Sequence, residues 1–286
     1  MSNNFEYYPD LDDPDFYKKI YSKKEFHKNI IPVERRTFEQ ICNSTDFKLL
    51  PQQKLLKNYL SIHTPYNGVL VFHGTGVGKT CSAISIAEGY KDLVMSNNKR
   101  ILIIVSQNIQ DNFKNELFNP EREKLKKKKD DSVQCSGKEY ELTSHKYLTD
   151  EQRYKKIKNM IYNKYEFIAY RAFANQVKNI TSWNGKTNDD GNIPEIVKKI
   201  IKHNFSNRVI IIDEAHNIKK SDGGETRVLP ILKTIIKYAN NIKLVLMTAT
   251  PMYNKSNEIV ELLNLLLLND NREIIKKSDI FQNDKL

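Results

Sequence analysis

The residues best suited to chemistry lie in a glycine-rich run, His73 to Thr80 (HGTGVGKT), between the apolar residues Val69–Phe72 and a helix-forming stretch from Cys81 to Glu88. Glycines let a backbone wrap closely around phosphate groups and turn its N–H groups inward, and a helix N-terminus adds a favourable dipole. A strand, such a loop and a helix in this order are typical of a phosphate-binding loop. We therefore expect Lys79 to reach the β- and γ-phosphates of ATP and Thr80 to bind Mg²⁺.

The loop departs from the strict phosphate-loop pattern at one position. That pattern has glycine five positions before Gly78, where this chain has His73. The other elements are present, so we favour phosphate binding over an ordinary glycine-rich turn. The residues predicted to line the nucleotide here are His73, Gly74, Thr75, Gly76, Val77, Gly78, Lys79, Thr80 and Cys81.

An acidic pair follows another apolar run. Val209–Ile212 leads directly into Asp213-Glu214-Ala215-His216. Carboxylates at the carboxyl end of a parallel strand face the crevice where α/β folds bind ligands. Asp213 could hold Mg²⁺, directly or through water, and Glu214 could act as general base on the attacking water. A strand capped by a solvated acidic pair is the alternative, and the phosphate loop upstream disfavours it.

A third set of polar residues begins 32 residues after His216, where Leu244–Met247 leads into Thr248-Ala249-Thr250. Short hydroxyl side chains at this strand end can hydrogen-bond to the neighbourhood of His216 and Glu214. In isolation these residues would suggest an ordinary strand-to-loop turn.

Five short runs are expected to be strands: 69–72, 101–105, 165–170, 209–212 and 243–247. Their apolarity is continuous rather than alternating, which predicts burial on both faces, and helix-length segments separate most of them. The fold class expected is α/β, a doubly wound, mainly parallel sheet with right-handed crossovers. A helix is expected near 52–62.

The remaining segments predict the domain organisation. Residues 1–45 lack a sustained period and are expected to be an N-terminal extension, 46–270 the nucleotide-binding domain and 271–286 a tail. Residues 119–150 are expected to be an insertion at the sheet edge, with a lysine run (126–129) that favours a solvated loop over a nucleic-acid contact. Residues 182–192 are expected to form a surface loop.

Composition limits the function classes. Forty-six Lys and Arg against 35 Asp and Glu give a net charge of +11, which suits a polyanionic partner but could equally reflect biased composition. Three cysteines without paired spacing indicate neither a disulfide framework nor a zinc site, which predicts a reducing, intracellular setting. No signal peptide or membrane span is expected.

Taken together, the three motifs resemble motifs I, II and III of superfamily 2 helicases of the DEAH-box type, whose N-terminal motor domain has a RecA-like P-loop fold. The lead-in Thr64–Asn67, the run from His73 to Gly76 and the segment Cys135–Tyr140 look more narrowly like the helicase-like ATPases of nucleocytoplasmic large DNA viruses. That group includes the small subunit of the poxvirus early transcription factor. The resemblance extends from about Tyr8 to Asn269.

The resemblance implies further roles. Gln53 matches the glutamine that reads adenine, with Gln52 as a rival, although Gln53 could simply be a helix-surface residue. Ser106 and Gln107 match the motif that contacts the nucleic-acid backbone, although Ser106 could instead cap a helix. Tyr170 and Arg171 could contact nucleic acid at another strand end. Thr248, Ala249 and Thr250 match the motif that couples hydrolysis to nucleic acid.

Members of this superfamily carry a second motor domain whose arginines reach the γ-phosphate. Only 36 residues follow Thr250, so the sequence leaves no room for that domain. The chain could be a fragment, one half of a split gene completed by another chain, or a reduced binding subunit. An arginine finger contributes about 10³- to 10⁵-fold in rate, so the isolated chain is expected to hydrolyse ATP slowly.

The leading hypothesis is an ATP- and Mg²⁺-dependent helicase or translocase motor domain that acts on DNA or RNA in viral transcription. The alternative is a transcription or assembly subunit that binds ATP and nucleic acid without hydrolysis. Glu214 argues against that alternative, since a site that only binds has no need of a general base. A small-molecule kinase would leave the second and third motifs unexplained.

Overall fold

The computed structural model describes residues 7–29, 49–74, 76–124, 134–136, 139–140, 147–183, 192–219, 228–252 and 255–281. The chain divides into two compact units. The first contains residues 1–66, 80–90 and 111–162, and the second contains residues 67–79, 91–110 and 163–286.

A five-stranded sheet forms the second unit, in the order β1-β5-β4-β2-β3. All four pairs of neighbouring strands are parallel. The strands are β1 (Gly68–Phe72), β2 (Ile101–Ile104), β3 (Tyr165–Ile168), β4 (Val209–Ile212) and β5 (Lys243–Thr248). From β2 the chain adds β3 at one edge of the sheet, and it then adds β4 and β5 on the other side of β2. Such a change in the direction of strand addition is the topology of a doubly wound sheet. The predicted α/β class is therefore confirmed, and the predicted strands match to within two residues.

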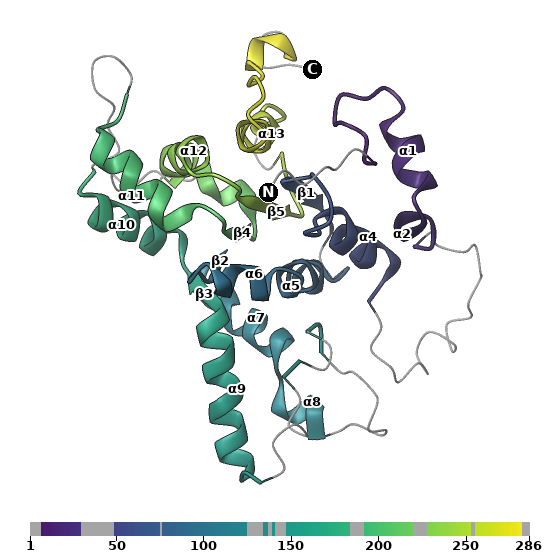
Figure 1. Ribbon diagram of the computed structural model, residues 1–286. Helices are drawn as coiled ribbons and strands as arrows, with labels where there is room; N and C mark the ends of the chain where they lie inside the picture. Colours follow the sequence, from purple (N-terminus) through teal and green to yellow (C-terminus); the bar gives the residue numbers. More distant parts are fainter. Residues whose placement is uncertain are drawn as a thin grey trace. The chain divides into compact units, whose positions relative to one another are not determined.

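Four helices cover one face of this sheet: α10 (Tyr170–Thr181), α11 (Glu195–Phe205), α12 (Val228–Tyr238) and α13 (Glu258–Asn269). Figure 1 shows them on the same side of the strands. Alternate strand residues, such as Leu102, Ile210 and Leu244, pack with these helices in one core cluster. The intervening residues Ile103, Ile211 and Val245 are buried as well. Burial on both faces explains why the strands are continuously apolar.

The register brings four strand ends to one edge of the sheet. Phe72 pairs with Thr248, Ile212 with Leu246 and Ile104 with Ile212. Because all strands run in the same direction, their carboxyl ends share this edge. The shorter elements of the unit are α6 (Lys91–Ser96) and the 3₁₀ helices η1 (Gln107–Ile109), η3 (Ala215–Lys219) and η4 (Lys277–Asp279).

The first unit is helical. It contains α1 (Phe16–Ser22), α2 (Lys24–His27), α4 (Pro51–Tyr59), α8 (Pro120–Lys124) and most of α5 (Lys79–Glu88), α7 (Gln110–Leu117) and α9 (Asp150–Lys164). The helix expected near 52–62 is therefore confirmed, at Pro51–Tyr59.

An aromatic cluster fastens the N-terminal segment to α4. Tyr66 stacks on Tyr59 at 4.5 Å between ring centroids and meets Phe16 and Tyr8 edge to face. Its hydroxyl donates a hydrogen bond to the carbonyl of Pro9. The described part of the extension is thus packed against the helical unit.

The structure corrects the expectation about the cysteines, because it joins Cys81 on α5 to Cys135 in a disulfide. The spacing of the cysteines gave no indication of this disulfide, because its two cysteines are 54 residues apart in the sequence. The segment around Cys135 is also held by hydrogen bonds. Its N–H donates to the carbonyl of Glu116, and the Tyr140 hydroxyl donates to Glu88 at the far end of α5.

The structure also corrects the surface loop expected at 182–192 at one residue, Trp183, whereas Ser182 and Asn192 are exposed as expected. Trp183 is 6% exposed and belongs to the core cluster beside α10 and α11. Residues 184–191 lie outside the described residues, as does the lysine run 126–129. Within the described part of the chain, no helix is long and apolar enough to cross a membrane.

Candidate nucleotide-hydrolysis site

The glycine-rich loop connects β1 to α5, which begins at Lys79. Gly76 and Gly78 have φ angles of +79° and +81°, a region that side chains rarely adopt, so glycine is required at both positions. A Cβ added at Gly74 or Gly76 would meet no atom within 4 Å, so the backbone there faces open space. Thr75 lies outside the described residues. The described loop fits the prediction of a backbone that a phosphate can approach closely.

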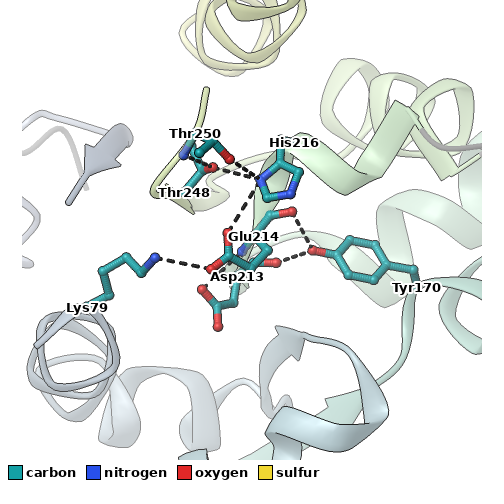
Figure 2. Close-up of polar contacts among 7 residues, drawn as sticks. All are labelled: Lys79, Tyr170, Asp213, Glu214, His216, Thr248 and Thr250. Atoms are coloured by element: carbon teal, nitrogen blue, oxygen red, sulfur yellow. Dashed lines mark hydrogen bonds and ion pairs between the residues drawn. The ribbon is translucent and has the colours of Figure 1, made fainter. Parts of the chain in front are cut away.

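Lys79 is directed at the acidic pair after β4 (Figure 2). Its Nζ lies 3.1 Å from Oε1 of Glu214, and only 12% of the lysine side chain and 28% of the glutamate side chain are exposed. The first and second predicted motifs therefore meet in space, 135 residues apart in the sequence.

Asp213 is the most buried acid of this group. Burial, with the neighbouring charge of Glu214 as a second cause, raises the pKa of Asp213 to about 6. One of its carboxylate oxygens accepts a hydrogen bond from the N–H of Glu214. Two adjacent carboxylates, one of them poorly solvated, make a site whose charge a divalent cation would balance. Carboxylate oxygens are also the kind of donor that Mg²⁺ prefers.

His216 connects the acidic pair to the third motif. Its Nδ1 is hydrogen-bonded to the Thr248 hydroxyl at 2.9 Å, and it lies 3.4 Å from the Thr250 hydroxyl and 3.4 Å from Oε2 of Glu214. The Thr248 hydroxyl also accepts a hydrogen bond from the N–H of Thr250. This is the contact that the hydroxyl residues at the end of β5 led us to expect. Ala249 lies between the two threonines and is half-buried.

Tyr170 belongs to this constellation, which the sequence did not indicate. Its hydroxyl donates to the carbonyls of Asp213 and Glu214, the latter at 3.1 Å (Figure 2). The hydroxyl is thus engaged within the chain, and a nucleic-acid contact by Tyr170 stays a prediction. Arg171, the next residue, is exposed.

His73 stands close to Lys79. Burial, and secondarily the positive charge of Lys79, lowers the pKa of His73, which favours the neutral imidazole.

Three other predicted nucleotide residues belong to the helical unit. Thr80 and Cys81 follow Lys79 in the first turn of α5, and the Cys81 side chain is taken up by the disulfide. Gln53 is 3% exposed, so it is not a helix-surface residue, and its Oε1 accepts a hydrogen bond from the N–H of Leu50. Its rival Gln52 is half-buried. An adenine contact by Gln53 stays a prediction.

The predicted nucleic-acid residues lie just beyond β2. Ser106 precedes η1 and makes no side-chain cap, whereas Gln107 is exposed. Ser106 is therefore not explained by helix capping.

Comparison with known proteins identifies the family. The model of the SNF2-related domain matches residues 51–284. "Putative ATP-dependent RNA helicase R563" of Acanthamoeba polyphaga mimivirus is 33% identical over 92% of this chain and 40% of its own length. "Putative ATP-dependent RNA helicase L377" of the same virus is 30% identical over 91% of this chain and 23% of its own length. "Putative helicase 087L" of Invertebrate iridescent virus 3 is 30% identical, with shares of 91% and 24%.

The chain belongs to the SNF2-related domain family and has the fold of a superfamily 2 helicase motor domain. The resemblance to helicases of large DNA viruses is likewise confirmed. The chain spans less than half the length of each of these relatives. Among solved structures, the "Sulfolobus solfataricus SWI2/SNF2 ATPase core in complex with dsDNA" covers 78% of this chain and 36% of its own, with a TM-score of 0.42 and 16% identity.

Proposed function

We propose that this chain is the ATP-hydrolysing motor domain of a viral helicase or translocase that acts on DNA or RNA during transcription. The observation that carries the proposal is the convergence of Lys79, Asp213 and Glu214 at the carboxyl edge of the sheet. The names of the viral relatives, as ATP-dependent RNA helicases, favour the same activity.

Each residue of the site has its own role in the proposed reaction. Lys79 exchanges Glu214 for the β- and γ-phosphates of ATP, which releases the Glu214 carboxylate to accept a proton from the attacking water. Mg²⁺, held by Asp213 and Thr80, would neutralise charge on the phosphates. His216 contacts both Glu214 and Thr248, so we propose that it couples the general base to the end of β5.

Nucleic acid is proposed to run past the exposed Gln107, with Ser106 beside it and Arg171 as a further candidate. The net charge of +11 favours such a polyanionic partner. A second motor domain is proposed to come from another chain or from further sequence, because the relatives are more than twice as long.

The test is ATP hydrolysis by the purified chain, measured with enzyme in excess over ATP so that slow turnover is visible. Reactions without nucleic acid are compared with reactions containing single-stranded or duplex DNA or RNA. Glu214→Gln is expected to bind ATP like the parent and to lose about 10²-fold or more in rate, because it cannot accept the proton. Lys79→Ala is expected to lose nucleotide binding.

The matched control is Glu195→Gln, which alters an exposed glutamate on α11 that is paired with Lys198. It should leave binding and rate unchanged. Parental ATP binding and parental turnover in both site variants would refute the assignment.

A further inference from the structure

Tyr170 contacts the catalytic segment through its hydroxyl group. It is the first residue of α10, just after β3. It is partly buried and packs against the core cluster. From there its hydroxyl reaches the two consecutive carbonyls of Asp213 and Glu214, more than 40 residues away in the sequence. The contact is made to backbone, so it acts on the path of the chain rather than on a carboxylate.

That path is unusual at Glu214. The φ angle of Glu214 is +49°, in the left-handed region. The other described non-glycine residues with positive φ are Asn98, Ser182, Asn207, Asn241 and Asn271. Asparagine tolerates this region because its short polar side chain can hydrogen-bond locally, whereas a glutamate gains no such relief. Such a backbone persists only where its surroundings hold it in place.

The bend decides where the Glu214 side chain goes. From this backbone one carboxylate oxygen meets Lys79 at 3.1 Å and the other lies 3.4 Å from His216. In an ordinary right-handed or extended conformation, the Cα–Cβ bond would leave the chain in a different direction. A donor that stabilises the two carbonyls of this bend therefore also aims the carboxylate.

Tyr170 is well suited to be that donor. A tyrosine hydroxyl has an ordinary pKa of about 10, so it keeps its proton across the physiological pH range and can donate throughout the reaction.

We propose that Tyr170 is a positioning residue for ATP hydrolysis, whose hydroxyl holds the Asp213–Glu214 backbone in the bend that aims the general base. The inference rests on the proposed role of Glu214 in hydrolysis. It assigns Tyr170 no contact with ATP, so it predicts an effect on the rate of the chemical step and none on nucleotide affinity.

Tyr170→Phe tests this by removing the hydroxyl and keeping the ring. The control is Tyr238→Phe on α12, a tyrosine that packs against the same core and whose ring, rather than its hydroxyl, is engaged by Lys198 and Lys237. We expect Tyr170→Phe to lower the single-turnover rate about tenfold, the effect of one lost hydrogen bond, with less than twofold change in the Kd of a non-hydrolysable ATP analogue. Tyr238→Phe should alter neither quantity.

Hydrogen exchange separates failure of this inference from failure of the proposed function. In Tyr170→Phe, the amides of Glu214 to Asn217 should exchange faster than in the parent, whereas those of β4 should not. If the parent does not hydrolyse ATP, the proposed function fails and faster exchange still supports Tyr170 as the support of the bend. An unchanged rate in an active parent, unchanged exchange, or an equal loss of rate and nucleotide affinity would each overturn the inference.

Discussion

Three of the residues that contact Glu214 come from three different elements. Lys79 is supplied by the start of α5, His216 by η3 and Tyr170 by the start of α10. The carboxylate itself is contacted from two sides, by Lys79 and by His216. Precise placement of this kind is what a general base requires, because a misplaced base loses much of its effect.

Thr248 offers a prediction at the residue scale, since its buried hydroxyl joins His216 to Thr250. In a double-mutant cycle measured by chemical unfolding, Thr248→Val and His216→Ala should be non-additive by about 0.5–1.5 kcal/mol, because each removes the same hydrogen bond. The control pair is Thr234→Val, whose hydroxyl bonds within α12 to Pro230, with His216→Ala. That pair should be additive; additivity in both cycles would mean that the hydrogen bond contributes nothing.

At the scale of elements, the disulfide fastens the start of α5. Cys81 lies two residues after Lys79, and the Cys135 segment is held again at the end of α5 by Tyr140. Closing a loop of this size restricts the unfolded chain and is expected to stabilise the fold by about 4 kcal/mol in the chain-entropy model.

Reduction is therefore expected to lower the melting temperature of the protein, as are Cys81→Ser and Cys135→Ser. The double variant should be no less stable than either single variant, because one cross-link is lost in each case. Cys42→Ser serves as the control and should leave the effect of reductant in place. Two titratable thiols at positions 81 and 135 in the unreduced protein would show that the pair is not formed.

The sequence predicted the strands and the contacts between motifs at their ends, but not the contacts made by residues outside those motifs. The strands were predictable because a strand buried on both faces is continuously apolar, as in Val209–Ile212. The meeting of Lys79 with Glu214 was predictable because both follow strands of one parallel sheet. The Cys81–Cys135 pair and the Tyr170 contacts were missed because a tyrosine or cysteine in isolation carries no sign of its partner. The positive φ of Glu214 could not be predicted either, because glycine or asparagine is the residue normally expected in that conformation.

For the whole molecule, the net charge of +11 predicts salt-sensitive binding of nucleic acid. Each phosphate contact neutralised by lysine or arginine releases counterions, so the logarithm of the binding constant should fall linearly with the logarithm of salt concentration. Fluorescence anisotropy with labelled single-stranded and duplex DNA and RNA would give the slopes. Binding that does not weaken with salt would mean that lysine and arginine side chains do not contact the phosphates of the nucleic acid.

The left-handed backbone at Glu214 has a consequence for how such a chain would change under selection. Asparagine or glycine at position 214 would relieve about 1 kcal/mol of conformational cost, so a relative that had given up hydrolysis would gain stability by accepting either. A glutamate is disfavoured here by its backbone conformation, whereas the proposed role of its carboxylate in hydrolysis would favour it. On that proposal, a glutamate at this bend is a sign of selection for activity, and it can be sought at the same bend in other chains of this fold.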